Sequence, residues 1–267
     1  MAKPSPHELE IIGEVRERIS DLRLSDEYLQ PKNLVRFVRA RNEQLDQIED
    51  MIRKNACYHD TYDTEIIMRW VPLNSIVEGF PYRIVGFDNL GGLVIVFPVG
   101  TWVTAAVSGK REEFTRWAIQ VLEKTWALMR FNSKGKDYIP QFCAIIDLEG
   151  FGWRHLTCYD AIQGFLNMFK VFEANYPDTL RSAFIINEMP IFGTFWRLLR
   201  PIISDVTHAK ISFLGSDKSL WAKSIGQLAK RDQFPEKYGG DQPPNYTVNL
   251  DEIGLNEFIF QNGNGEF

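Results

Sequence analysis

The sequence is poor in cysteine and in histidine, and it has no excess of positive charge. Its three cysteines are an odd number without a C-x-x-C pair, so neither a disulfide framework nor a cysteine zinc site is expected. The four histidines show no metal-ligand spacing, and no metal site is expected. Thirty Lys and Arg residues against thirty-five Asp and Glu residues give a net charge of −5. That balance argues against a nucleic-acid partner, because nucleic-acid-binding domains are usually strongly basic.

Long apolar runs are also missing. No segment approaches the roughly 18 consecutive apolar residues of a membrane-spanning helix, and the N-terminal segment has no apolar run typical of a signal peptide. We therefore expect a cytoplasmic protein. Neither a G-x-S-x-G nucleophile motif nor a Walker A phosphate loop occurs. The segment from Gly150 to His155 imitates half of G-x-G-x-x-G, but His155 replaces the third small residue, whose absence of a side chain permits close packing.

Aromatic residues are abundant: nineteen Phe, nine Tyr and seven Trp make up 13% of the 267 residues. Side chains of this kind either fill a core or line an apolar cavity. The 45% hydrophobic and 24% charged fractions are ordinary for a globular chain, and a chain of this length buries enough surface to need no covalent staples. The composition therefore predicts a folded protein with one large domain or two smaller ones.

The hydrophobic pattern changes along the chain. Residues 8–70 show apolar positions at helical spacing, which predicts a helical N-terminal part. From about residue 80, short β-rich runs alternate with helical patterns. The expected strands are 82–87, 93–99, 142–148, 182–186 and 211–214, and the expected helices are 111–131, 157–175 and 190–203. This alternation predicts an α/β domain with a largely parallel sheet.

The segment 190–203 carries more apolar surface than one packing contact requires. Two adjacent stripes are expected on this helix, one made of Ile191, Phe195, Leu198 and Ile202 and one made of Phe192, Trp196, Leu199 and Ile203. Pro201 cannot donate a backbone hydrogen bond and should disturb the end of the helix. Two interpretations remain open: an ordinary buried helix, or a lid between an apolar ligand and a membrane surface.

Four segments in a fixed order resemble one protein family. They are LVRFVRARN (34–42), AIIDLEGFGWRH (144–155), YPDTLRSAFIINEMPIFGTFWRLLRPIISDVTHAKISFLG (176–215) and FPEKYGG (234–240). Together they resemble the CRAL-TRIO lipid-binding and exchange proteins. The resemblance implies an all-helical N-terminal lobe (1–75), an α/β lobe (76–243) whose mostly parallel sheet floors an apolar lipid pocket, and a C-terminal extension (244–267).

The resemblance further implies a monomeric, non-enzymatic carrier that binds one hydrophobic lipid and contacts membranes transiently. The ligand would be a phospholipid such as phosphatidylinositol, or an isoprenoid such as tocopherol or a retinoid. No cofactor is implied apart from the bound lipid. A mobile gate helix would let the lipid enter, since its apolar stripes remain in an apolar medium when it opens against a bilayer.

The residues implied by the resemblance fall into three groups. The pocket wall would include Ala118, Leu122, Ile146, Met168, Phe172, Ala183, Phe192, Phe195 and Leu199. The gate would present Ile191, Trp196, Arg197 and Arg200 to the membrane. The headgroup would meet Arg41, Asp178 and Lys210, where the two cations suit a phosphate and the carboxylate suits hydroxyl groups. Asp178 stands where phosphatidylinositol-binding members usually carry Glu.

Two other functions are compatible with the residues. Asp147, Glu149 and His155 follow a predicted strand, where α/β enzymes often place catalytic groups, so an enzyme acting on a nucleotide or an ester is an alternative. Asp147 can equally be a structural hydrogen-bond acceptor at the turn. The apolar helix can also dock a partner protein, which would make the chain an interaction module.

Overall fold

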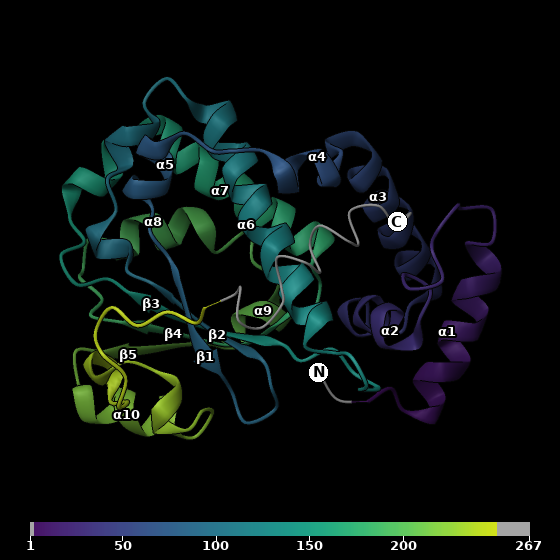
Figure 1. Cartoon of the computed structure of the whole chain (residues 1–267). Helices are drawn as coiled ribbons and strands as arrows, with labels where there is room; N and C mark the ends of the chain where they lie inside the picture. The colour runs from purple at the N-terminus through teal and green to yellow at the C-terminus, as the bar shows by residue number, and fades with distance from the viewer. Residues whose placement is uncertain (1–2, 250–267) are drawn as a thin grey trace.

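The computed structural model describes residues 3–249, and the chain begins with three helices, α1 (Pro6–Arg18), α2 (Pro31–Ala40) and α3 (Leu45–Tyr62). Ser5 caps α1 because its hydroxyl accepts from the backbone of Glu8, whose carboxylate accepts in turn from the backbone of Ser5. The apolar faces of the three helices form a core of their own, with Ile12, Leu34 and Ile52 fully buried. Figure 1 shows them grouped beside the rest of the molecule.

Two short helices, α4 (Thr64–Arg69) and α5 (Asn74–Gly79), connect this bundle to the sheet. Asp63 adopts a left-handed conformation with φ of 41° between α3 and α4, and its side chain accepts from the backbone of Ile66. The chain thus turns from α3 into α4 at a single capped residue. The expected lobe boundary at residues 75 and 76 lies inside α5.

The sheet has five strands in the order β1-β2-β3-β4-β5. Their bounds are β1 (Arg83–Phe87), β2 (Leu93–Phe97), β3 (Phe142–Asp147), β4 (Leu180–Ile186) and β5 (Ile211–Gly215). The β1–β2 pair is an antiparallel hairpin, and the other neighbours are parallel. Asp88 closes the hairpin by accepting from the backbone of Leu90 and Gly92. The prediction of an α/β fold with a mostly parallel sheet is confirmed.

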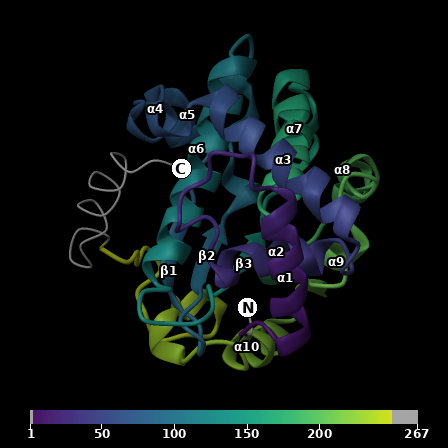
Figure 2. The same cartoon turned by 90° about the vertical axis from the view of Figure 1, so that its right-hand side faces the viewer.

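Five further helices and several 3-10 turns complete the described part of the fold. The helices are α6 (Arg111–Phe131), α7 (Tyr159–Asn175), α8 (Phe192–Leu199), α9 (Asp205–His208) and α10 (Lys218–Gly226). The 3-10 turns are η1 (Val99–Thr101), η2 (Thr104–Val107), η3 (Trp153–Leu156), η4 (Arg231–Gln233) and η5 (Glu236–Tyr238). Figures 1 and 2 show α6, α7 and α8 on one side of the sheet and α10 on the other.

Strand alternation decides which side chains meet which layer. Successive residues of a strand point to opposite faces, and Val94, Ile145 and Phe184 pack with Trp221 of α10 and with the closing segment around Phe234 and Tyr238. The residues between them point toward α6, α7 and α8. The two faces of one sheet therefore have separate cores.

The helix expected over residues 190–203 is shorter in the structure. The α-helix α8 covers only Phe192–Leu199, and the backbone from Arg200 continues as turns. Pro201 explains the early end, because it has no N–H to continue the hydrogen-bond ladder. The expectation of a helix is correct in type and wrong in extent.

Candidate functional site

A cavity of about 200 Å³ lies between the sheet and the helices α6, α7 and α8. A volume of roughly 10–15 Å³ is sufficient for one water molecule, so this space is far larger than a packing defect. The wall is rich in aromatic rings, which include Phe97, Trp102, Trp117, Trp126, Phe151, Phe165, Phe169 and Tyr176. The abundance of aromatic residues in the sequence is therefore explained in part by the lining of a cavity.

The floor of the cavity comes from alternate residues of the strands. The sheet contributes Ile95, Phe97, Phe142, Ala144, Ile146, Ala183, Ile185 and Ile211. Ala144 and Ala183 are paired across β3 and β4, and their small side chains leave room above the middle of the sheet. The hollow is thus partly a consequence of two alanines at neighbouring positions on one face.

The hydroxyl groups along the wall mostly donate to the protein itself. Thr104 donates to the carbonyl of Arg154 (3.0 Å), Thr125 to that of Val121 (2.8 Å) and Thr179 to that of Tyr176 (2.7 Å). The phenol of Tyr176 donates to the buried carboxylate of Glu123. These hydroxyl donors are therefore already used, whereas the buried Nε2 atom of His155, which also lines the cavity, has no hydrogen-bond partner among the described residues. The remaining wall is suited to hydrocarbon.

A buried acidic residue, Glu123, lies behind the wall. Burial raises its pKa, although the hydrogen bond from Tyr176 acts in the opposite direction. His59 lies nearby, with its Nδ1 atom 3.8 Å from Glu123 Oε1, and burial lowers the pKa of His59 to about 3. His59 is therefore uncharged at physiological pH, and burial favours the uncharged form of Glu123 as well.

Eight of the nine expected pocket residues line the cavity. They are Leu122, Ile146, Met168, Phe172, Ala183, Phe192, Phe195 and Leu199. Ala118 does not; it is buried in an adjacent aromatic cluster that includes Phe80, Phe114 and Phe165. Sequence reasoning missed the aromatic wall residues Trp102, Trp117 and Trp126, for which the high aromatic content was the one available signal.

The four expected gate residues have different surroundings. Trp196 lines the cavity, and its ring packs edge-on against Phe213 at 5.0 Å between centroids. Ile191 is half-buried against the cluster formed by Leu148 and Phe151. Arg197 is exposed, whereas Arg200 pairs with Asp205 at 2.7 Å. Trp196 is thus a half-buried residue of the cavity wall.

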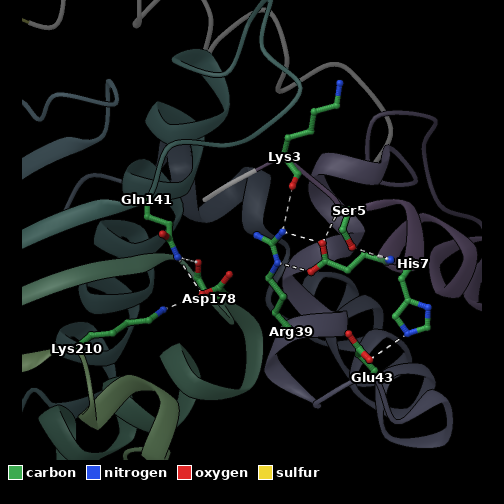
Figure 3. A network of polar contacts seen from close by, with 9 residues as sticks. Lys3, Ser5, His7, Arg39, Glu43, Gln141, Asp178 and Lys210 are labelled. Atoms are coloured by element: carbon green, nitrogen blue, oxygen red, sulfur yellow. Dashed lines mark hydrogen bonds and ion pairs between the residues drawn. The ribbon is translucent and has the colours of Figure 1, made fainter.

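Two of the three expected headgroup residues lie together at the amino ends of β4 and β5. The Lys210 ammonium is 2.7 Å from the Asp178 carboxylate and donates to the carbonyl of Leu180 at 2.8 Å. Gln141 donates to both the carbonyl (2.7 Å) and the carboxylate (2.9 Å) of Asp178. Figure 3 shows this group facing Arg39 of the helical bundle.

Arg41 has no hydrogen bond or salt bridge to Asp178 or Lys210 in the structure of residues 3–249. It follows the end of α2 and donates to the carbonyl of Ala40 at 3.3 Å. The arginine on this side is Arg39, whose pKa is raised by its hydrogen bond with Glu8 and further by the charge of Asp178. The end of α2 explains the difference, because Arg39 lies in the last turn of the helix whereas Arg41 follows it in a non-helical conformation.

The acidic residues that suggested an enzyme have structural partners. Asp147 accepts from the backbone of Glu149 (3.0 Å), the amide of Asn187 (2.9 Å) and the phenol of Tyr238 (3.1 Å), and it pairs with Lys237 at 2.7 Å. Burial alone would raise the pKa of Asp147, but Asn187 and Lys237 outweigh it and the pKa is lowered. These contacts attach the closing segment to the sheet on the face opposite the cavity.

His155, the third residue named for the alternative enzyme function, lies in the cavity wall. Its ring stacks on Phe151 with centroids 4.6 Å apart, and its Nδ1 atom accepts from the backbone of Gly152 at 3.0 Å. Burial lowers its pKa, so it is an uncharged wall residue. It therefore lies apart from Asp147, which faces the opposite side of the sheet.

No group of three or more metal-ligating side chains gathers anywhere in residues 3–249.

Known proteins resemble the chain in sequence and in fold. Residues 78–240 match the CRAL/TRIO domain. Protein real-time from Anopheles gambiae is 25% identical over 215 residues, which are 78% of this chain and 31% of that protein, so the chain spans about a third of its relative. The crystal structure of Sfh5 superimposes with a TM-score of 0.71 at 16% identity, covering 98% of this chain and all of Sfh5.

Among residues 3–249, none of the helices combines the length and the apolar character needed to cross a membrane.

The family match covers more than half of the chain and includes the sheet and all three helices around the cavity. The chain therefore belongs to the CRAL/TRIO domain family, whose members are generally lipid-binding and lipid-transfer proteins rather than enzymes.

Proposed function

We propose that the chain binds a single hydrophobic lipid in the cavity and transfers it between membranes, or presents it there, without covalent chemistry. The observation that carries this proposal is the cavity itself, with its apolar wall and internally satisfied hydroxyl groups. Exposing hydrocarbon to water costs about 0.8 kcal/mol per methylene. A cavity that shields roughly fifteen methylenes therefore offsets about 12 kcal/mol of the cost of keeping a lipid chain outside a membrane.

The gate in this proposal is α8 with the turns that follow it. Phe192 and Leu199 are buried, and Phe195 and Trp196 contribute to the cavity wall. Moving α8 away in water would expose these side chains, whereas the same movement against a bilayer leaves them in an apolar medium. Ile191 and the exposed Arg197 would stay at the rim, and Arg200 would exchange Asp205 for a lipid phosphate.

The polar end of the ligand is assigned to Asp178 and Lys210. An anionic headgroup such as that of phosphatidylinositol would compete with Asp178 for the ammonium of Lys210, while Asp178 would accept from sugar hydroxyls. Arg41 belongs to this group only if the end of α2 rearranges, because its side chain has other contacts. An isoprenoid such as tocopherol or a retinoid would use the same cavity without opening the Asp178–Lys210 pair.

The organisation of the chain follows from the same proposal. Residues 1–75 would act as a helical lobe docked on the lipid-binding lobe (76–243), with 244–267 as an extension, of which 250–267 lie outside the described residues. The protein would work as a cytoplasmic monomer that contacts membranes transiently. Phosphatidylinositol is the first ligand to test.

Organic extraction of the purified chain, followed by mass spectrometry, tests the proposal. We expect one hydrophobic ligand per chain, and we expect the protein to move that ligand between two vesicle populations. A bound nucleotide, or an activity lost only in Asp147→Asn, would instead support the enzyme. A chain that contains no lipid and takes none from vesicles would contradict the proposal.

A further inference from the structure

Arg36 of α2 is a fully buried cation, and the buried Glu123 is an acidic neighbour beyond salt-bridge distance. Its side chain is 1% exposed, and it forms no salt bridge among residues 3–249. Its Nε atom donates to the side-chain oxygen of Asn33 (3.1 Å), and its Nη1 atom donates to the backbone carbonyl of Asn175 (3.1 Å). Burial lowers the pKa of Arg36 to about 10, so the guanidinium remains charged at neutral pH. A buried charge is costly unless something compensates it.

The compensation comes from the end of a cavity-wall helix. Asn175 is the last residue of α7, and the free carbonyls at the C-terminus of a helix carry the negative end of its dipole. The guanidinium also lies over two rings, 4.3 Å from the centroid of Phe37 and 4.4 Å from that of Trp126. Both interactions are favourable to a cation.

Both partners of Arg36 outside its own bundle belong to helices that form the cavity wall. Trp126 of α6 lines the cavity directly. The helix α7, which ends at Asn175, supplies Ile162, Phe165, Met168, Phe169 and Phe172 to the same wall. One side chain of the helical bundle therefore touches two of the three helices that enclose the ligand space.

A second contact from the bundle reaches the same carbonyl. The amide of Asn55 in α3 donates to the carbonyl (3.2 Å) and to the side chain (3.3 Å) of Asn175. Tyr28 holds Asn55 in place through a hydrogen bond of 2.7 Å from its phenol. The end of α7 is thus capped by side chains from two helices that lie more than a hundred positions earlier in the sequence.

We propose that Arg36 is a positioning residue that caps α7 and backs Trp126, so that the docking of the helical bundle determines how firmly the cavity retains its lipid. This inference rests on the proposed function for its ligand, but the capping contact is independent of any ligand. Because coupling between two sites is reciprocal, a bound lipid also stabilises the docking of α2 and α3 on α6 and α7.

The experiment compares Arg36→Met with Lys32→Met in the full chain. Lys32 also lies on α2 and bridges to the α/β part, but it donates to Ser133 (3.2 Å) and Lys136 (3.4 Å), away from α7. Both variants remove one cation and its contacts between the bundle and the α/β part, which are Asn175 and Trp126 for Arg36 and Ser133 and Lys136 for Lys32. Arg36→Lys is the conservative variant, which keeps a cation but loses the planar fork.

Two measurements are made on each variant. The first is amide hydrogen exchange at residues 172–176 without added lipid, where we expect roughly tenfold faster exchange in Arg36→Met than in Lys32→Met. The second is release of a phosphatidylcholine with a fluorescent nitrobenzoxadiazole acyl chain into unlabelled phosphatidylcholine vesicles. We expect release from Arg36→Met to be roughly tenfold faster than from wild type, with Arg36→Lys intermediate and Lys32→Met unchanged.

Equal exchange at the end of α7 in the two methionine variants would overturn the capping contact. Faster exchange combined with unchanged probe release would overturn the link to lipid retention. A wild-type chain that takes up no probe would count against the proposed function with this lipid, while the exchange comparison would still decide the role of Arg36. If Arg36→Met does not fold, exchange and release in Arg36→Lys decide both points against the same Lys32→Met control.

Discussion

The two faces of the sheet are made by the same strands and differ in what they enclose. On one face, Trp221, Phe234 and Tyr238 fill the space above the strands with side chains that are 2% exposed or less. On the other face, large rings from α6, α7 and α8 stand around a cavity of about 200 Å³. Strand alternation alone does not decide between a solid and a hollow layer; the helices above each face, and small residues such as Ala144 and Ala183 below, decide it.

The filled face should account for most of the stability of the sheet. Replacing Trp221 with alanine removes a fully buried ring and should lower the free energy of unfolding by about 3–5 kcal/mol. Chemical denaturation measures this change. Trp196→Ala, on the cavity side and only half-buried, is the matched variant, and an equal loss of stability in the two would contradict the contrast between the faces.

The hollow face should account for ligand uptake. Ala183→Trp places an indole in the cavity and should abolish uptake of lipid from vesicles, with a smaller loss of stability than Trp221→Ala because the space is already present. Ala174→Trp adds the same ring on the exposed side of α7 and should leave uptake unchanged. Normal uptake by Ala183→Trp would show that the lipid binds elsewhere.

The polar anchor of the filled face should give the protein an acid-sensitive component of stability. The pKa of Asp147 is lowered in the folded state, so its contribution is present above the unfolded value of about 3.9 and is lost as the pH falls through the lower folded value. Unfolding measured from pH 6 to pH 2 should show a weaker pH dependence in Asp147→Asn than in wild type. Identical slopes would mean that Asp147 does not couple protonation to folding.

The Asp178–Lys210 pair, proposed as the headgroup site, adjoins the lining residues Thr179, Leu180 and Ile211 and should affect anionic lipids more than neutral ones. Lys210→Ala removes the ammonium beside Asp178 and should slow the transfer of phosphatidylinositol several-fold more than that of a neutral isoprenoid, in line with the strength of a charge-assisted hydrogen bond. Transfer between labelled and unlabelled vesicles measures both rates. A uniform effect on the two lipids would remove Lys210 from the headgroup site.

Periodicity predicted the layers well because it is a local property. The apolar runs at 142–148 and 182–186 indicate buried strands, and β3 and β4 lie there. The pocket wall was instead implied by the family resemblance, and eight of the nine residues named for it line the cavity. The exception, Ala118, lies one helical turn before the lining residue Leu122, and its surroundings depend on the rings packed against it. Which residues cover a helix face is a tertiary property that spacing does not contain.

Contacts between distant segments were the part that the sequence did not reveal. Arg36 and Asn175 are separated by 139 positions, and nothing in LVRFVRARN distinguishes the buried arginine from Arg39, which pairs with Glu8, or from Arg41 at the helix end. The direction of Trp196 was missed for a related reason. Two apolar stripes on one helix do not show which of them faces inward, and the helix ends at Leu199 rather than at residue 203.

Native mass spectrometry of the wild-type chain beside Ala183→Trp is the most direct measurement of whether this protein carries a lipid. After incubation with vesicles that contain phosphatidylinositol, we expect a wild-type mass raised by one lipid molecule and an Ala183→Trp mass equal to that of the bare chain. A wild-type chain that remains bare, or two chains that acquire the same adduct, would show that the cavity does not hold the lipid.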